Sequence, residues 1–518
     1  MWSLKQSSPI LPRPTRESDP WHVYKLAAFV SLGALLFGYD QGVMGMIVAD
    51  QRWKDLMRPA NSWVTGAVVS MYDIGCFAGA MSTGALADWY GREKLLALAS
   101  FVCIIGAVIQ AGSYTIPQII IGRVILGLGV GGCAAGVPLY QSEIAPSTLR
   151  GRLIGIEQMI LCTGELVAFW LDYWLSLLST PDWWRIPLAV QILPAFILGL
   201  GCCSWVLPSP RWLVAQGRNE CAHEVLVRLH GQDAAETELK QIQETMRLER
   251  HVKVSWTGMM KSPILRLTVL GCGIQSFQQI TGTNSILYYA PSLFQKGGIT
   301  NPQTANLATG GVGIALFLSS WVPIFYFDRL GRKTWLQIGT IGMMLSMLGI
   351  AAFHRQAEQY PESGGNHIII LFPYLFYIFF NISWGVAAWT YPSEIFPLSM
   401  RAKGNALATS ANWASCYVVA QISPVLGDVI GWGLYVVYAL ICVVAFGFVR
   451  FALGTLSILT FSCANWITVE TKDRSLEEMT ALFGLDDFFA ASDGAKDDQV
   501  GLLEGPALED ENNDSHHA

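Results

Sequence analysis

Six carboxamide side chains lie inside long apolar stretches of the sequence. They are Gln158, Gln278, Gln279, Asn284, Asn381 and Asn412. A carboxamide offers donors and an acceptor together, which suits the mixed hydrogen-bonding groups of an uncharged, hydroxyl-rich solute. Unsatisfied polar groups are costly in an apolar environment, so these side chains should face a cavity or another helix. The pattern therefore predicts either a polar solute site or a set of contacts that hold helices together.

Asp40 and Arg123 are ionisable residues within two other apolar stretches. An unpaired charge at membrane depth is expensive, and pairing with the opposite charge is the expected resolution. We therefore predict an ion pair between them. Protonation of Asp40 would weaken this pair and let the neighbouring helices rearrange. A purely structural salt bridge is the alternative.

The sequence contains no nucleophile–base arrangement, phosphate-binding loop or metal-ligand spacing that we can defend. Ten of the 11 cysteines fall in apolar stretches and only Cys221 lies in a polar segment, which is typical of packed thiols. Acidic residues near the C-terminus contribute to the formal net charge of -6, and no basic nucleic-acid surface is indicated. We expect no enzymatic activity, no cofactor, no bound metal and no nucleic-acid partner.

The elements that must position these residues are helices that cross a lipid bilayer. Of the 518 residues, 52% are hydrophobic and only 14% are charged. Apolar stretches of about 20 residues, long enough to cross the hydrocarbon core, recur about twelve times. Buried strands of a soluble α/β protein would show apolar runs of only about 4 to 8 residues. The predicted fold class is therefore an all-α membrane protein with about twelve transmembrane helices.

A polar segment between the sixth and seventh apolar stretches divides the chain into halves. We predict a tail at 1–24, a six-helix bundle at 25–206, a linker with short helices at 207–265, a second six-helix bundle at 266–468 and a tail at 469–518. Basic residues cluster in alternate loops, which should face the cytosol. The linker and both termini are then cytosolic, although Arg52, Lys54 and Arg58 run against the trend.

Charged motifs repeat between the two halves. A motif of Asp followed three and four residues later by Gly and Arg occurs once in each half, and so does a motif of Glu followed by basic residues. The charged members are Asp88, Arg92, Glu143, Arg152, Asp328, Arg332, Glu394 and Arg401. Matched motifs at equivalent places indicate a duplicated architecture.

Together these motifs resemble the sugar porter family of the major facilitator superfamily, in the fungal branch of hexose, pentose, quinate and glycerol carriers. The resemblance extends from about residue 25 to residue 479, and further motifs that carry it lie at 38–40, 122–123, 209–213, 278–284, 389–394 and 470–472. It implies two pseudo-symmetric six-helix bundles.

The resemblance also implies roles for individual residues. It makes Asp40 a proton acceptor with Arg123 as its partner. The predicted sugar-contact set combines the six carboxamides with Trp389, which would stack on a sugar ring, and Phe37. The charged motif residues would form a cytosolic latch that ties the halves together when the carrier faces outward. Tyr288 and Tyr289 complete the predicted gating set.

The sequence departs from the family pattern in several places. The motif at 207–211 lacks its usual glutamate, and Val469 replaces a proline. Val386 stands where these carriers often have proline, so we expect a softened kink in the tenth span. The apolar run at 433–467 exceeds one span by about seventeen residues, which suggests a translated intron or an insertion at 450–466.

These observations predict a carrier that moves a sugar or polyol through a multi-pass protein of the plasma membrane by alternating access, coupled to proton symport. An uncoupled facilitator is one alternative. A transporter-like sensor that binds sugar without moving it is another, but sensors tend to have longer cytosolic tails. Hexose, pentose, polyol and disaccharide carriers share these carboxamides, so the pattern leaves the substrate open.

Overall fold

The structure is a computed structural model that describes residues 22–145, 150–251, 255–262, 264–330, 332–360, 367–396 and 398–451. Every regular element within these residues is helical. The predicted insertion at 450–466 and the tail at 469–518 lie outside the described residues, except for Arg450 and Phe451.

The first half of the chain forms nine helices within the described residues. They are α1 (His22–Val30), α2 (Leu32–Ala49), α3 (Gln51–Met57), α4 (Ser62–Tyr90), α5 (Arg92–Ala111), α6 (Ile116–Ile144), α7 (Arg150–Ser176), α8 (Arg185–Val190) and α9 (Ile192–Ser204). The linker forms α10 (Pro210–Ala215), α11 (Asn219–His230), α12 (Gln232–His251) and the 3₁₀ turn η1 (Gly258–Met260). The first helix begins at His22, just before the predicted boundary at residue 25.

The second half repeats this pattern of long helices. Its elements are α13 (Ile264–Ile280), α14 (Thr283–Lys296), α15 (Pro302–Ser319), α16 (Trp321–Leu330), α17 (Arg332–Gln359), the 3₁₀ turn η3 (His367–Ile370), α18 (Leu371–Ile382), α19 (Trp384–Ile395), α20 (Leu398–Ile430) and α21 (Gly433–Phe451).

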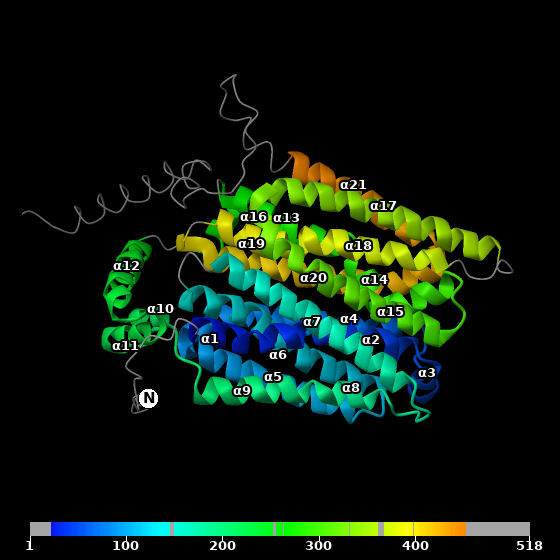
Figure 1. Ribbon diagram of the computed structural model, residues 1–518, viewed down its shortest axis with the longest axis horizontal. Coiled ribbons are helices and arrows are strands. Elements are labelled where there is room, and N and C mark those ends of the chain that lie inside the picture. The colour runs from blue at the N-terminus through cyan, green and yellow to red at the C-terminus, as the bar shows by residue number, and fades with distance from the viewer. Residues whose placement is uncertain are drawn as a thin grey trace, which may run out of the picture.

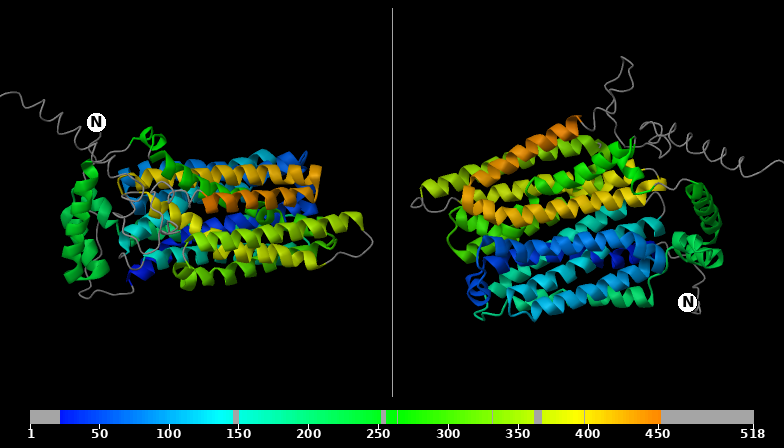
Figure 2. Two further views of the ribbon diagram at one scale, coloured as in Figure 1. Left: turned by 90° about the horizontal axis from the view of Figure 1, so that it is seen from above. Right: turned by 180° about the vertical axis from the view of Figure 1, so that it is seen from behind.

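The long helices lie side by side in two groups, α1 to α9 and α13 to α21 (Figure 1). The linker helices α10, α11 and α12 lie across one end of the bundle, and the views from above and behind show the same arrangement (Figure 2). We call the opposite end, where α3 lies, the distal end. Between the halves, α4 packs along α20, α2 along α14 and α7 along α15.

Eleven helical stretches among the described residues are long and apolar enough to cross a membrane. The remaining span is the seventh, which the sequence predicts as one stretch but which the structure divides into α13 and α14. Gly282 lies at this division with a φ of +92°, and a Cβ there would lie 2.6 Å from the ring of Tyr438. A side chain would therefore be strained by both the backbone and the packing. The all-α architecture predicted from the apolar stretches is confirmed.

The tenth span is also divided, at Ser383, where φ is -126° and ψ is -82°. We expected a softened kink because Val386 replaces proline. The span nevertheless divides here into α18 and α19, and Val386 lies within the first turn of α19. The Ser383 hydroxyl donates to Phe379 O over 2.6 Å. A Cβ at Gly339 of α17 would overlap this hydroxyl, so close helix packing accompanies the division.

Candidate functional site

Four of the six predicted carboxamides meet between α13, α14 and α20, and all four are buried. Asn412 of α20 donates from Nδ2 to Gln278 Oε1 over 2.7 Å, and its Oδ1 accepts from Gln279 Nε2 over 3.0 Å. Asn284, just after the division of the seventh span, donates to Gln279 Oε1 over 2.7 Å. Side chains from three helices thus form a continuous hydrogen-bonded group.

Gln275 completes this group, although the sequence analysis did not select it. Its Oε1 accepts from Asn412 Nδ2 over 2.6 Å, and its Nε2 donates to Ala388 O of α19 over 2.8 Å. Its position three residues before Gln278 places both on one face of α13, which is the signal that could have identified it. We call Gln275, Gln278, Gln279, Asn284 and Asn412 the carboxamide cluster.

The divided tenth span borders the carboxamide cluster. Gln278 Nε2 donates to the backbone carbonyl of Trp384, the first residue of α19, over 2.9 Å. Helix ends leave backbone groups without intrahelical partners, so a divided span in a membrane is tolerated where it lies inside the protein or lines a cavity. The cluster therefore lies between two divided helices.

Gln158 and Asn381 form a second, smaller group. Gln158 Nε2 of α7 donates to Asn381 Oδ1 of α18 over 3.3 Å, which joins the two halves. Asn381 Nδ2 donates to Leu316 O over 2.7 Å. Gly385 lies between the two groups, because a Cβ there would lie 2.8 Å from Asn381 Oδ1 and its neighbour Trp384 accepts from Gln278.

The two predicted aromatic contacts lie in different settings. Phe37 is buried, and its ring lies 5.1 Å from that of Trp413, the residue after Asn412. Trp413 is buried too and was not selected from the sequence, although its position beside Asn412 was a usable signal. Trp389 is partly buried and packs against the main hydrophobic core.

Asp40 and Arg123 form the predicted ion pair. Arg123 Nη1 lies 2.9 and 3.0 Å from the two carboxylate oxygens of Asp40, and the side chains are 0% and 1% exposed for Arg123 and Asp40. Arg123 Nη2 donates to Val69 O of α4 over 3.0 Å. The guanidinium also lies 4.6 Å from the ring centre of Tyr72. The pair therefore joins α2, α4 and α6 within the first half.

Tyr288 and Tyr289 lie where α14 bends. Tyr289 has a φ of -123° and a ψ of 18°, and Pro291 follows in the same helix, where it lacks a backbone donor and crowds the preceding turn. Tyr289 OH donates to Ala420 O of α20 over 2.8 Å. Tyr288 OH lies 3.5 Å from Asp73 Oδ1 of α4. These side chains thus contact helices of both halves.

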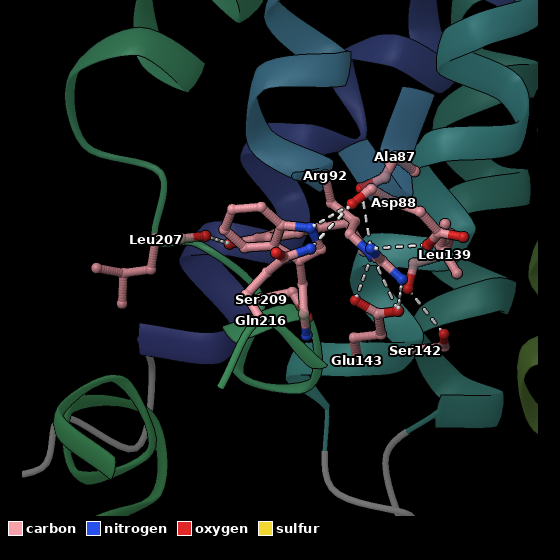
Figure 3. A network of polar contacts seen from close by, with 11 residues as sticks. Ala87, Asp88, Arg92, Leu139, Ser142, Glu143, Leu207, Ser209 and Gln216 are labelled. Atoms are coloured by element: carbon pink, nitrogen blue, oxygen red, sulfur yellow. Dashed lines mark hydrogen bonds and ion pairs between the residues drawn. The ribbon is translucent and has the colours of Figure 1, made fainter. Parts of the chain in front are cut away.

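Three of the predicted latch residues form one network at the linker end (Figure 3). Arg92 Nε lies 2.8 Å from Glu143 Oε2, and Arg92 Nη1 lies 3.3 Å from Asp88 Oδ1. Trp212 of α10 donates from Nε1 to Asp88 O over 3.0 Å. This network ties the linker to the first half.

The other latch residues are only partly covered by the described structure. Arg332 begins α17. The side chains of Arg152, Asp328, Glu394 and Arg401 lie outside the described part of the chain.

The distal end joins the halves through polar contacts. Ser70 of α4 donates to Gln421 Oε1 of α20 over 2.6 Å. Lys296 Nζ lies 2.6 Å from Asp428 Oδ1, and the Ser62 hydroxyl also contacts this carboxylate. A cavity of about 250 Å³ opens beside these contacts.

Asp50, at the start of α3, explains a departure from the charge trend. Arg52 Nη2 lies 2.7 Å from its carboxylate, and Trp183 Nε1 donates to it over 3.1 Å. Burial favours the neutral acid, but the hydrogen bonds from Arg52 and Trp183 outweigh it and hold the pKa of Asp50 below its usual value. The positive charge of Arg52 is therefore locally neutralised.

Within the described residues, no group of three or more His, Cys, Asp or Glu side chains is placed to hold a metal ion. The ten cysteines of this part of the chain are free thiols.

Comparison with known proteins gives consistent matches over most of the chain. A family model described as "Sugar (and other) transporter" matches residues 26–483. The D-xylose transporter of Levilactobacillus brevis is 34% identical over 458 residues, covering 88% of this chain and 94% of that protein. The quinate permease of Neurospora terricola is 33% identical over 505 residues, covering 91% and 90% respectively.

Solved structures show the same architecture. The proton:xylose symporter XylE bound to 6-bromo-6-deoxy-D-glucose matches with a TM-score of 0.73 and 26% identity, over 89% of this chain and 99% of that one. The inward open conformation of the xylose transporter XylE from E. coli matches with a TM-score of 0.71 and 26% identity, over 89% and 100% respectively. All of these relatives are transporters, in agreement with the expectation that the chain is not an enzyme.

Proposed function

This chain belongs to the sugar transporter family of the major facilitator superfamily, and from that premise we propose that it carries a sugar or polyol by alternating access, coupled to a proton. The family resemblance predicted from the motifs is confirmed, and the chain is a multi-pass membrane transporter. The substrate, the proton coupling and the roles of individual residues are our proposals.

The carboxamide cluster is the observation that supports a sugar or polyol as the substrate. Its side chains are neutral, buried and bonded mainly to one another and to backbone carbonyls. A hydroxyl both donates and accepts, so a polyol can exchange these bonds one for one without bringing in a charge. Phe37 and Trp413 supply apolar faces nearby, and we keep Gln158, Asn381 and Trp389 as further contacts along the path.

Proton coupling is supported by the burial of Asp40 with Arg123. Protonation removes the carboxylate charge that holds the guanidinium, and Arg123 then keeps its bond to Val69 O and its contact with Tyr72. Helices α2, α4 and α6 would move relative to one another as that bond weakens. Among the relatives, XylE is described as a proton:xylose symporter.

We place the protein in the plasma membrane with the linker and both termini in the cytosol. The positive-inside rule supports this orientation, and it makes the distal end extracellular. The domain limits that we propose remain 1–24, 25–206, 207–265, 266–468 and 469–518. Asp88, Arg92 and Glu143 then belong to the cytosolic latch. Tyr288 and Tyr289 would form a separate gate on the extracellular side.

The test is uptake of a panel of labelled hexoses, pentoses, polyols and quinate by transporter-null cells that express the full chain, with external pH recorded. We expect uptake of at least one sugar or polyol together with alkalinisation outside the cells. Uptake without proton movement would identify a facilitator. Binding by the purified protein without uptake would identify a sensor, and neither binding nor uptake across the panel would refute the proposal.

A further inference from the structure

Asp73 is a buried carboxyl group that the sequence analysis did not use. It lies on α4, is 0% exposed, and its Oδ2 has no hydrogen-bond partner. Its Oδ1 lies 3.5 Å from Tyr288 OH, a long contact. The thiol of Cys416 is its other contact. A carboxylate so placed would be a buried charge without a strong partner, which is costly.

The charge of Arg123 acts on both Asp73 and Asp40. Arg123 Nη1 already bonds both carboxylate oxygens of Asp40, whose charge acts on Asp73 with the opposite sign. The titratable and charged groups that face Asp73 come from its own helix and from α2, α6, α14 and α20. They are Cys76, Asp40, Arg123, Tyr288, Tyr289 and Cys416. Arg123 is thus the cation that acts on both carboxyl groups, Asp40 and Asp73.

The position of Asp73 depends on how the halves meet. Its own helix belongs to the first half, whereas Tyr288 and Cys416 belong to the second. Ser70 and Gln421 join α4 to α20 toward the distal end. Asp73 lies three residues after Ser70 on α4, and Cys416 lies five residues before Gln421 on α20. Separation of the distal ends would remove the second half from Asp73 and admit water, in which a carboxylate is stable.

Asp73 is also connected to the carboxamide cluster. Asn284 Nδ2 donates to Cys416 Sγ over 2.7 Å, and Tyr288 OH lies 3.7 Å from the same sulfur atom. The Cys416 thiol therefore contacts both Asp73 and Asn284. Tyr288 and Cys416 therefore connect Asp73 with Asn284 of the carboxamide cluster.

We propose that Asp73 is a second proton-binding group, distinct from Asp40, and that it must carry a proton for the distal end of the carrier to close. A proton from the water on that side binds the carboxylate before closure and leaves again after opening. The inference rests on the proposed alternating-access function. It makes closure dependent on the pH at the distal side.

The test measures closure directly in the purified full-length protein. Spin labels are introduced at Ala60 and Val429, exposed positions at the distal ends of the two halves, as unnatural amino acids because the chain has 11 cysteines. The distance distribution between them is recorded over a pH series. For a one-proton link, the ratio of open to closed protein should rise by up to about tenfold per pH unit above the titration midpoint.

Four variants sharpen the test. Asp73→Asn and Asp73→Ser, which cannot ionise, should stay closed at all pH values, and Asp73→Glu should keep the pH response. Asp172→Asn is the matched control, because Asp172 is equally buried, has no hydrogen-bond partner for either oxygen and acts on Tyr39 within the first half. It should behave as wild type.

A wild-type distribution that does not change with pH overturns the inference, and so does an unchanged response in Asp73→Asn or Asp73→Ser. An equal loss of response in Asp172→Asn also overturns it, because the effect would then be general. None of these outcomes depends on sugar uptake. Sugar transport with a pH-independent distance would refute only this inference. A pH response that Asp73→Asn abolishes, in a protein that neither binds nor carries any solute of the panel, would refute only the proposed function.

Discussion

The carboxamide cluster in the second half and the Asp40–Arg123 pair in the first half handle buried polar groups in different ways. The cluster is neutral, draws side chains from α13, α14 and α20, and lies beside two divided spans. The pair is charged, and its residues lie within α2 and α6, whose helices are continuous around them.

This difference indicates which buried polar groups can exchange hydrogen-bond partners at a low cost in free energy. A neutral hydrogen bond contributes about 0.5 to 1.5 kcal/mol net, and one polyol hydroxyl can replace it. Loss of one member of a buried ion pair leaves an uncompensated charge, at a cost of about 3 to 5 kcal/mol. This difference favours our proposal that the carboxamide cluster recognises the solute and that the Asp40–Arg123 pair couples transport to the proton.

The largest effect should come from removing the titratable member of the pair. Asp40→Asn keeps size and hydrogen-bonding capacity but cannot bind or release a proton, so accumulation of sugar against a gradient should be abolished while exchange persists. Sugar-induced alkalinisation outside cells, normalised to surface protein, measures this. A variant that still concentrates sugar with protons would remove Asp40 from the coupling role.

Removal of the basic member should destabilise the fold. Arg123→Gln leaves Asp40 buried without its cation, and we expect a loss of about 3 to 5 kcal/mol. The amount of folded protein and its thermal unfolding in detergent report this loss. The double variant Asp40→Asn/Arg123→Gln is the control and should recover much of the stability, since no buried charge remains. Equal losses in the single and double variants would contradict the comparison.

Changes in the carboxamide cluster should be smaller and confined to affinity. Gln279→Ala or Asn284→Ala each removes a directional group worth about 0.5 to 1.5 kcal/mol, which corresponds to a weakening of about two- to twelvefold in sugar Kd. Binding to the purified protein is the measurement. Ser346→Ala, on α17, removes a local bond to Gly342 O and serves as a control. Unchanged dissociation constants in both cluster variants would assign these residues to packing.

Asp50 provides a reference pair outside the membrane spans and should show the smallest effect. Because its pKa in the folded protein lies below the usual value, its contribution to stability is present above that usual value and is lost as pH falls through the lowered pKa. Asp50→Asn should flatten this acidic part of the unfolding curve. Thermal unfolding of both proteins over a pH series tests the sign, and a steeper acid loss in the variant would contradict it.

The sequence predicted which residues belong to the candidate site better than it predicted which of them contact one another. Carboxamides in apolar runs stand out because polar groups there are costly, and Asp40 and Arg123 stand out for the same reason. The sequence did not separate Gln158 and Asn381 from the other four, because contacts between α7 and α18 depend on how the halves dock. Asp73 carried the same signal as Asp40, but no basic residue in the sequence indicated its surroundings.

The sequence by itself determined the membrane class, the duplicated halves and the family, because apolar run length and repeated charged motifs are local properties of the chain. Only the tertiary structure decided where spans seven and ten divide. Those positions depend on close packing, of the Tyr438 ring against Gly282 and of Ser383 against Gly339, which no run of apolar residues encodes. The docking of α13 against α20 brings Gln275 to Asn412, and the meeting of the two halves places Asp73 beside Tyr288.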